Sequence, residues 1–240
     1  MQQPGSDVFG IILARGGSKR IPHKNIVQVN GKPLLAYTCE AARGSKLLTR
    51  VILSTDSAEI AAVGKEYGVE VPFMRPRELA SDEANSMDAI RHVLRELEKK
   101  EGYAPPLFVL LQPTSPLRTA EHIDEGIRLM LKTDADSVVS VTEVPSLFNP
   151  SFAMQIKEGK LTKPKKKALQ EMEKYYAYNG AVYVLRTERL RQSDDPFGDD
   201  CRPLVMSKED SLDIDTKEDL ALAECLLQRK GGSSQILSIS

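Results

Sequence analysis

The sequence predicts an α/β fold with a mostly parallel central sheet and helices on both faces of that sheet. Short β-branched apolar runs alternate with amphipathic helical patterns along most of the 240 residues. Several of these runs are apolar throughout, which is typical of strands covered by helices on both faces. Strand–helix–strand alternation favours parallel pairing through right-handed crossovers.

Five segments have the length and composition of strands, because they are short and rich in Val, Ile, Leu and Phe. They cover residues 8–13, 51–54, 107–111, 137–141 and 181–185.

Four helices are predicted from a capping residue that precedes apolar positions three and four apart. The expected caps are Ser57, Ser86, Thr119 and Thr216. Thr216 also opens a capping box with Asp219.

The pattern indicates a single domain over residues 1–230. Residues 145–178 interrupt it, because they lack a helical period and contain the basic run "KPKKK" at 163–167. We expect this segment to be an arm or lid inserted into the domain. The Gly/Ser-led residues 231–240 are expected to form a flexible tail.

Composition excludes several classes of function. Lys+Arg (33) and Asp+Glu (34) nearly cancel, so no global field attracts nucleic acid or anionic lipid. No apolar run reaches the length of a membrane span, and the first residues do not resemble a secretion signal. Three widely spaced cysteines, Cys39, Cys201 and Cys225, suit reduced thiols in the cytoplasm.

The first functional signal is the segment "ILARGGSKRIPHKN" at residues 12–25. It follows a predicted buried strand, and the carboxyl end of such a strand is the usual ligand crevice of an open α/β sheet. Its glycines permit close approach of backbone N–H groups, and Arg15, Lys19 and Lys24 supply positive charge. A triphosphate is the natural ligand. The alternative is a solvated basic loop.

The second signal is the pair Asp213 and Asp215 in "SLDIDTKED". In extended chain, residues two apart point to the same side, so both carboxylates can meet one cation. Mg²⁺ typically takes one or two carboxylates together with phosphate oxygens. Alternatively, Asp213 ends a strand and Asp215 or Thr216 caps the following helix.

Three further segments place polar side chains next to predicted strands or helices. "LLQPTSPLR" leaves a strand through Gln112, whose amide could bind a ligand, and ends at Arg118, which could equally be a surface charge. "RPRELASDEANS" precedes the helix capped by Ser86, a possible anion site, although an ordinary turn with a cap is the simpler interpretation. "YYAYNGAVYVL" brings Asn179 to a strand entry, which suits either a turn or sugar recognition.

Taken in order, the motifs A-R-x-x-S-K-x-x-P-x-K-N, R-P-x-E-L-A-S-D, L-Q-P-T-S-P-L-R, N-G-A-x-Y and S-x-D-I-D-T resemble the CMP-N-acylneuraminate cytidylyltransferases (CMP-sialic acid synthetases) over about residues 8–228. The resemblance implies a three-layer, Rossmann-like nucleotidyltransferase fold and a homodimer whose arm reaches the partner. It also implies the reaction CTP + N-acylneuraminate → CMP-N-acylneuraminate + diphosphate with Mg²⁺, for which Mn²⁺ can substitute. The 3-deoxy-manno-octulosonate cytidylyltransferases match less well, because they usually have Lys-Pro in place of Lys24-Asn25 and lack the Asp-Ile-Asp spacing.

The resemblance assigns a role to each site residue. The residues that would hold the nucleotide are Ala14, Arg15, Ser18, Lys24, Asn25, Arg75 and Ser86. Asn179 and Tyr183 would line the sugar pocket, with Gln112 at the reacting end. Asp213 and Asp215 would bind the metal and, with Arg15, Lys24 and Gln112, form the catalytic set.

The sequence leaves alternatives for the acceptor acid and for the class of function. The acceptor could be legionaminate or pseudaminate, because the arm lacks basic residues in "PSLFNPSFAM" and has Leu169 and Ala177 roughly where arginines are expected. The lysines at 163–167 could substitute for them. The competing class is a non-catalytic nucleotide-binding module, which the Asp-Ile-Asp pair disfavours.

Overall fold

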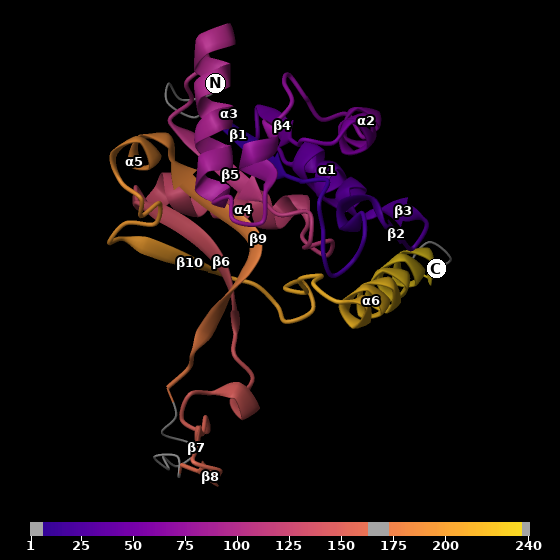
Figure 1. Cartoon of the computed structure of the whole chain (residues 1–240), viewed down its shortest axis with the longest axis vertical. Helices are drawn as coiled ribbons and strands as arrows, with labels where there is room; N and C mark the ends of the chain where they lie inside the picture. Colours follow the sequence, from indigo (N-terminus) through magenta and orange to yellow (C-terminus); the bar gives the residue numbers. More distant parts are fainter. Residues whose placement is uncertain (1–6, 163–172, 237–240) are drawn as a thin grey trace.

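Figure 1 shows the computed structural model of the chain, which describes residues 7–162 and 173–236. Its centre is a six-stranded sheet in the order β10-β6-β9-β5-β1-β4. The strands are β1 (Val8–Leu13), β4 (Arg50–Ser54), β5 (Leu107–Leu111), β6 (Ser137–Glu143), β9 (Tyr176–Arg186) and β10 (Cys201–Val205).

Pairing in this sheet is mostly parallel, which confirms the predicted class. β1 pairs in parallel with β4 and β5, and β10 with β6, whereas β9 is antiparallel to both of its neighbours. All five predicted strands are present. β10 was not predicted, because "CRPLV" contains an arginine and a proline, which only an edge strand accommodates easily.

Helices cover both faces and give three layers. The helices are α1 (Leu34–Gly44), α2 (Ala58–Glu66), α3 (Ser86–Glu101), α4 (Ala120–Thr133), α5 (Thr187–Gln192) and α6 (Lys217–Ile236). α1, α2 and α4 pack on one face with the β1 residues Val8 and Ile12, and α3 and α5 pack on the other with Phe9 and Ile11. This division follows from the two-residue period of a strand.

Capping explains where most of these helices begin. Ser57 and Thr119 cap α2 and α4, as expected: Ser57 accepts from the Ile60 N–H, and Thr119 accepts from the His122 N–H. His122 completes a capping box with Thr119, which was not predicted. The prediction that Ser86 caps α3 was wrong. Asn85 is the cap, with extended backbone and a side-chain oxygen 2.9 Å from the Met87 nitrogen. Two adjacent residues that both favour the cap position leave the sequence ambiguous by one residue.

A third, smaller core lies beside the sheet. Residues 14–25, which follow β1 and are called the basic loop below, lead into a hairpin of β2 (Gln28–Val29) and β3 (Lys32–Pro33). α6 packs against this hairpin. Ile21, Val29, Leu34, Ile214 and Ala223 are buried there. The cluster therefore holds the basic loop beside the Asp-Ile-Asp segment. α6 continues to Ile236, into the segment expected to be the tail, of which residues 237–240 lie outside the described residues.

The described part of the predicted arm projects away from the body of the molecule (Figure 1). β6 and β9 run out as its stalk, with a register shift between Val139 and Val141. A short helical turn, η3 (Ser146–Phe148), and a hairpin of β7 (Ile156–Lys157) and β8 (Lys160–Leu161) follow. The lysine run at 163–167 and Leu169 lie outside the described residues. Over residues 7–162 and 173–236, no helix combines the length and hydropathy needed to cross a membrane.

Candidate functional site

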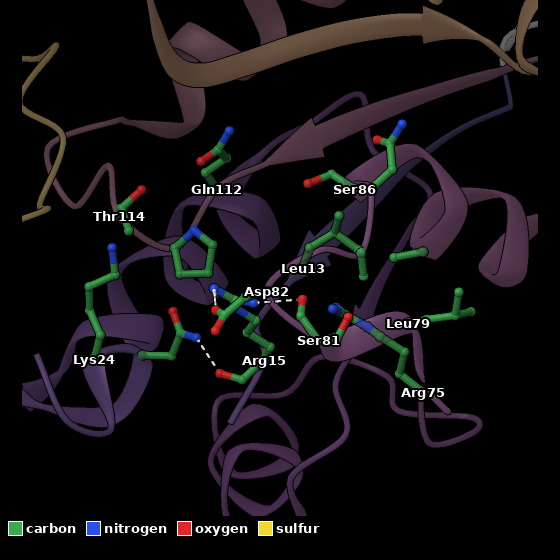
Figure 2. A pocket seen from close by; sticks show the side chains of 15 residues that line it. Leu13, Arg15, Lys24, Arg75, Leu79, Ser81, Asp82, Ser86, Gln112 and Thr114 are labelled. Carbon is green, nitrogen blue, oxygen red and sulfur yellow. Dashed lines mark hydrogen bonds and ion pairs between the residues drawn. The ribbon is translucent and has the colours of Figure 1, made fainter. Parts of the chain in front are cut away.

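A cleft of about 350 Å³ lies at the carboxyl edge of β1 and β5. Ile12 of β1 is in register with Leu111 of β5, so the loops after these two strands leave the sheet side by side. Figure 2 shows the lining side chains around the cleft. Those used below are Arg15, Lys24, Asn25, Arg75, Asp82, Ser86, Gln112 and Thr114.

Local hydrogen bonds fix the shape of the basic loop. Ala14 is buried, and its N–H donates to the Ser54 carbonyl at 3.1 Å. The Gly16 N–H donates to Asp56 Oδ1 at 2.8 Å, and the Asn25 amide donates to the Arg15 carbonyl at 2.9 Å. Ala14 and Asn25 therefore shape the loop, and of the two only Asn25 lines the cleft. Ser18 is half-buried and is not among the lining residues.

Lys24 joins the basic loop to the Asp-Ile-Asp segment. Its Nζ donates to the Ile214 carbonyl at 2.9 Å and to Asp215 Oδ1 at 3.1 Å. The other Asp215 oxygen accepts from Arg20 at 3.1 Å. The two motifs, 190 residues apart in sequence, thus meet at one side of the cleft.

The two aspartates of that segment differ in environment. Asp215 pairs with cations, and the cap of α6 is Thr216, whose hydroxyl accepts from the Asp219 N–H. Partial burial raises the pKa of the Asp213 carboxyl and the negative charge of Asp215 adds to this effect, while a hydrogen bond with Thr114 opposes it. The expected Thr216 cap is thereby confirmed, and it does not involve the Asp215 carboxylate. Asp213 lies in no strand, so the alternative that it ends one was wrong.

The carboxylate pair meets the chemical requirements of a hard cation. A divalent ion beside Asp213 would relieve the repulsion between the two carboxylates, and both supply oxygen ligands. In the described part of the chain, no three His, Cys, Asp or Glu side chains cluster as a metal site by themselves. Mg²⁺ sites of this kind typically combine one or two carboxylates with water and phosphate oxygens.

Arg75 places a second kind of cation in the cleft wall. Its side chain donates to the Ser54 hydroxyl at 3.0 Å and to the Ser54 carbonyl at 2.5 Å, and it is only 6% exposed. Burial lowers its pKa to about 10. Within residues 7–162 and 173–236, no carboxylate forms an ion pair with it, so part of its guanidinium can bind a ligand. Ser86 lies at the same end of the cleft (Figure 2).

Gln112 lines the cleft, and a buried arginine lies directly behind it. Arg118 donates to the carbonyls of Gln112 at 3.0 Å and Ala181 at 2.9 Å, and to the Thr38 hydroxyl at 2.5 Å. It is 3% exposed, and burial lowers its pKa to about 9. A surface position for Arg118 was therefore wrong. No pattern in the sequence predicts its burial, because a charged residue before a helix usually faces solvent.

The two residues expected in the sugar pocket lie outside this cleft. Asn179 is buried, and its amide bonds to Ser140, Ser211 and the Ala181 N–H. The Tyr183 ring packs edge-on against Phe197, and burial raises the pKa of its hydroxyl. The structure thus brings Arg15, Lys24, Asn25, Arg75, Ser86 and Gln112 together around the cleft, with Asp213 and Asp215 at its side. It leaves Asn179 and Tyr183 apart from them.

Asp82 was not expected at the site. Its carboxylate lies in the cleft, 2.8 Å from Arg15 and 2.7 Å from Lys19. Asp82 is the last residue of the motif R-P-x-E-L-A-S-D, but neither the motif nor its position in a polar loop shows that this loop meets the basic loop.

The chain is similar to known proteins over most of its length. The family model described as "Cytidylyltransferase" matches residues 9–230. A CMP-N,N'-diacetyllegionaminic acid synthase of Legionella pneumophila is 34% identical over 229 residues, covering 92% of this chain and 96% of that protein. An N-acylneuraminate cytidylyltransferase of Escherichia coli is 34% identical over 230 residues, covering 93% of this chain and 52% of that longer protein.

Among solved structures, a CMP:2-keto-3-deoxy-manno-octonic acid synthetase complexed with CTP has the same fold. It aligns with a TM-score of 0.71 at 15% identity, covering 93% of this chain and 99% of that one. Because the family model spans nearly the whole chain and includes the basic loop and the Asp-Ile-Asp segment, the chain belongs to the cytidylyltransferase family and is an enzyme of that family.

Proposed function

We propose that this cytidylyltransferase activates a nonulosonic, sialic-type acid by transferring CMP to it from CTP. The anomeric hydroxyl oxygen of the acid forms a bond to the α-phosphorus, and the bond from that phosphorus to the bridging oxygen breaks. Diphosphate leaves with the electron pair, and the hydroxyl proton passes to a base that we do not assign. The observation that carries the proposal is the contact between Lys24 and Ile214–Asp215, which joins a basic loop and two carboxylates at one cleft.

The chain's own residues would act mainly by position and charge, as is usual in phosphoryl transfer. Arg15 and Lys24 would neutralise the charge that develops on the α-phosphate and the leaving diphosphate. Arg75 and Ser86, which lie at the far end of the cleft from Lys24 (Figure 2), would recognise the cytidine. Gln112 lies between them and would position the acceptor.

Mg²⁺, or Mn²⁺ in its place, would be held by Asp213 and Asp215. When bound, such an ion supplies charge neutralisation at phosphate oxygens and lowers the pKa of a coordinated hydroxyl. The pKa of Asp213, raised by burial and by Asp215, supports this assignment because it marks a position that favours added positive charge.

The acceptor is proposed as N-acylneuraminate or one of the related acids legionaminate and pseudaminate. Support comes from the relatives described above, which are named for N-acylneuraminate and for diacetyllegionaminic acid at the same 34% identity. Equal identity does not favour either acid, so the assay must include both.

We also propose a cytoplasmic homodimer. The arm exposes large apolar side chains, with Leu147 at 77%, Phe148 at 70% and Ile156 at 75% exposure, and a second copy that covered them would remove this area from water. Cys39, Cys201 and Cys225 are all free thiols, which suits a reducing compartment. Light scattering on the wild type and on Phe148→Ser would test the dimer, and a monomeric wild type would contradict it.

The reaction itself is tested by diphosphate release with CTP, UTP, GTP and ATP, each with Mg²⁺ and a panel of nonulosonic acids. We expect release with CTP and one acid, and detection of the corresponding CMP-sugar by mass. Release that needs no acid, or that proceeds equally with all four nucleotides, would contradict the proposed reaction.

A further inference from the structure

Asp82 occupies the cleft in contact with two cations of the basic loop. Its Oδ1 lies 2.8 Å from Arg15 Nη2, and its Oδ2 lies 2.7 Å from Lys19 Nζ. Figure 2 shows the Asp82 side chain beside Arg15 in the middle of the lining residues. Arg15 and Lys19 belong to the cluster expected to bind phosphate, so a carboxylate holds the groups that an incoming anion needs.

The backbone next to Asp82 adds to this contact. Arg15 Nη1 donates to the Ser81 carbonyl at 2.7 Å, so both terminal nitrogens of its guanidinium are directed at residues 81 and 82. The short helical turn η2 (Arg77–Ala80) and the Asn85 cap of α3 bracket this loop. Lys19 and Arg15 also hold the pKa of the Asp82 carboxyl below its usual range, so the carboxylate is charged at neutral pH.

We propose that Asp82 is an internal competitor of the polyphosphate chain and that it sets the affinity of the cleft for phosphates. A nucleoside triphosphate would bind after Asp82 releases Arg15 and Lys19. This inference rests on the proposed function, because it takes a triphosphate as the ligand of the basic loop.

Competition of this kind follows from charge matching. A carboxylate and a phosphate present similar oxygens to a guanidinium or an ammonium group, so both cannot use the same N–H donors. If only the fraction of molecules with Asp82 released can bind phosphate, the apparent Kd is the intrinsic value divided by that fraction. Ligands without phosphate do not compete with Asp82. The same exchange favours release of diphosphate, because Asp82 rebinds the cations as the product leaves.

A different role would give the opposite result. If Asp82 instead holds Arg15 in the orientation that phosphate requires, its loss loosens phosphate binding. The two roles are therefore separated by the direction of one change in affinity.

The test is calorimetric titration of the full chain with CTP, inorganic tripolyphosphate, diphosphate and cytidine. The variants are Asp82→Asn, which removes the charge and keeps the shape, and Glu83→Gln as the matched control. Glu83 is exposed, is adjacent on the same loop and does not line the cleft. It therefore reports the effect of one lost negative charge without the contact. Asp82→Ala serves as a second variant, and thermal unfolding of each checks the fold.

We expect Asp82→Asn to lower the Kd for the three phosphate ligands by about threefold or more, as two exposed ion pairs allow. Cytidine binding stays unchanged in Asp82→Asn, and Glu83→Gln stays within about twofold of wild type for every ligand. Equal or weaker phosphate binding by Asp82→Asn and Asp82→Ala would overturn the inference, as would an equal gain in Glu83→Gln. If tripolyphosphate binds to the wild type and CTP does not, the proposed function fails, and the tripolyphosphate comparison still decides the role of Asp82.

Discussion

Arg118 should stabilise the frame of the site, and removing its guanidinium should weaken the whole fold. The side chain is fully enclosed and, among the described residues, pairs with no carboxylate. It bonds instead to the Gln112 and Ala181 carbonyls and the Thr38 hydroxyl. It thereby joins the end of β5 to β9 and α1. Arg118→Met keeps most of the side-chain volume and removes every donor.

The expected loss follows from these three bonds. A hydrogen bond to a charged group contributes about 1.5–3 kcal/mol, and acceptors left buried without a donor add a further cost. Burial lowers the pKa of Arg118 to about 9 because the buried charge is desolvated. Removing the cation also removes this desolvation cost, which partly offsets the loss of the hydrogen bonds. The net loss should be about 3 kcal/mol in unfolding free energy, which for a chain of this size is roughly 6–12 °C in Tm.

The assay is urea unfolding of Arg118→Met and Arg118→Lys, with Arg128→Met as the control. Arg128 lies on the exposed side of α4, pairs with Glu121 at 2.8 Å and lies 3.9 Å from the buried carboxylate of Asp124, so its removal should cost no more than about 1 kcal/mol. Arg118→Lys should recover part of the loss, because an ammonium can bond to some of the same acceptors. If Arg118→Met is as stable as Arg128→Met, the role assigned to the buried guanidinium is refuted.

Three further results are expected. Lys24→Ala should lose about 3 kcal/mol of transition-state stabilisation, or about a hundredfold in kcat/KM, and a loss below about threefold would exclude its proposed role. Asp215→Asn should shift the Mg²⁺ titration of activity to higher metal concentration, and Mn²⁺ binding measured by electron paramagnetic resonance should shift in the same direction. Unchanged titrations would mean that Asp215 does not bind the metal and only pairs with Lys24 and Arg20. Burial lowers the pKa of His122, whose Nδ1 accepts from the Thr119 N–H. As the pH falls, the unfolded chain therefore binds the proton before the folded protein does. The free energy of unfolding should decrease as the pH drops below about 6.5. His122→Gln, which preserves the capping box, should reduce this fall in urea unfolding at pH 7.5, 6.5 and 5.5, and an identical pH dependence would contradict the assignment.

The sheet could be predicted because its strands carry their own signal. A run such as "LFVLL" is buried on both faces and is recognisable without its neighbours. β10 and α1 were not predicted, each for a different reason. β10 contains polar residues that an edge tolerates, and α1 begins after Pro33 without a side-chain cap. Their formation depends on packing against elements distant in sequence.

The sequence motifs predicted which charged residues line or border the cleft, but not which partner every polar side chain takes. Lys24 and Asp215 meet because a loop after β1 and a segment before α6 share one small core through Ile21 and Ile214. Asn179 shows the limit of such prediction, since its amide bonds inside the protein through Ser140 and Ser211. Which hydrogen-bond partner a polar side chain takes is decided by tertiary contacts, and a local sequence pattern does not contain them.

A crystal structure of the chain with CTP and Mg²⁺ would show whether the basic loop and the Asp-Ile-Asp segment bind one triphosphate between them. We expect phosphates in contact with Arg15 and Lys24, the metal on Asp213, and cytosine at the end of the cleft near Arg75 and Ser86. A triphosphate bound away from Lys24 and Asp213, with the cleft holding another part of the ligand, would contradict it.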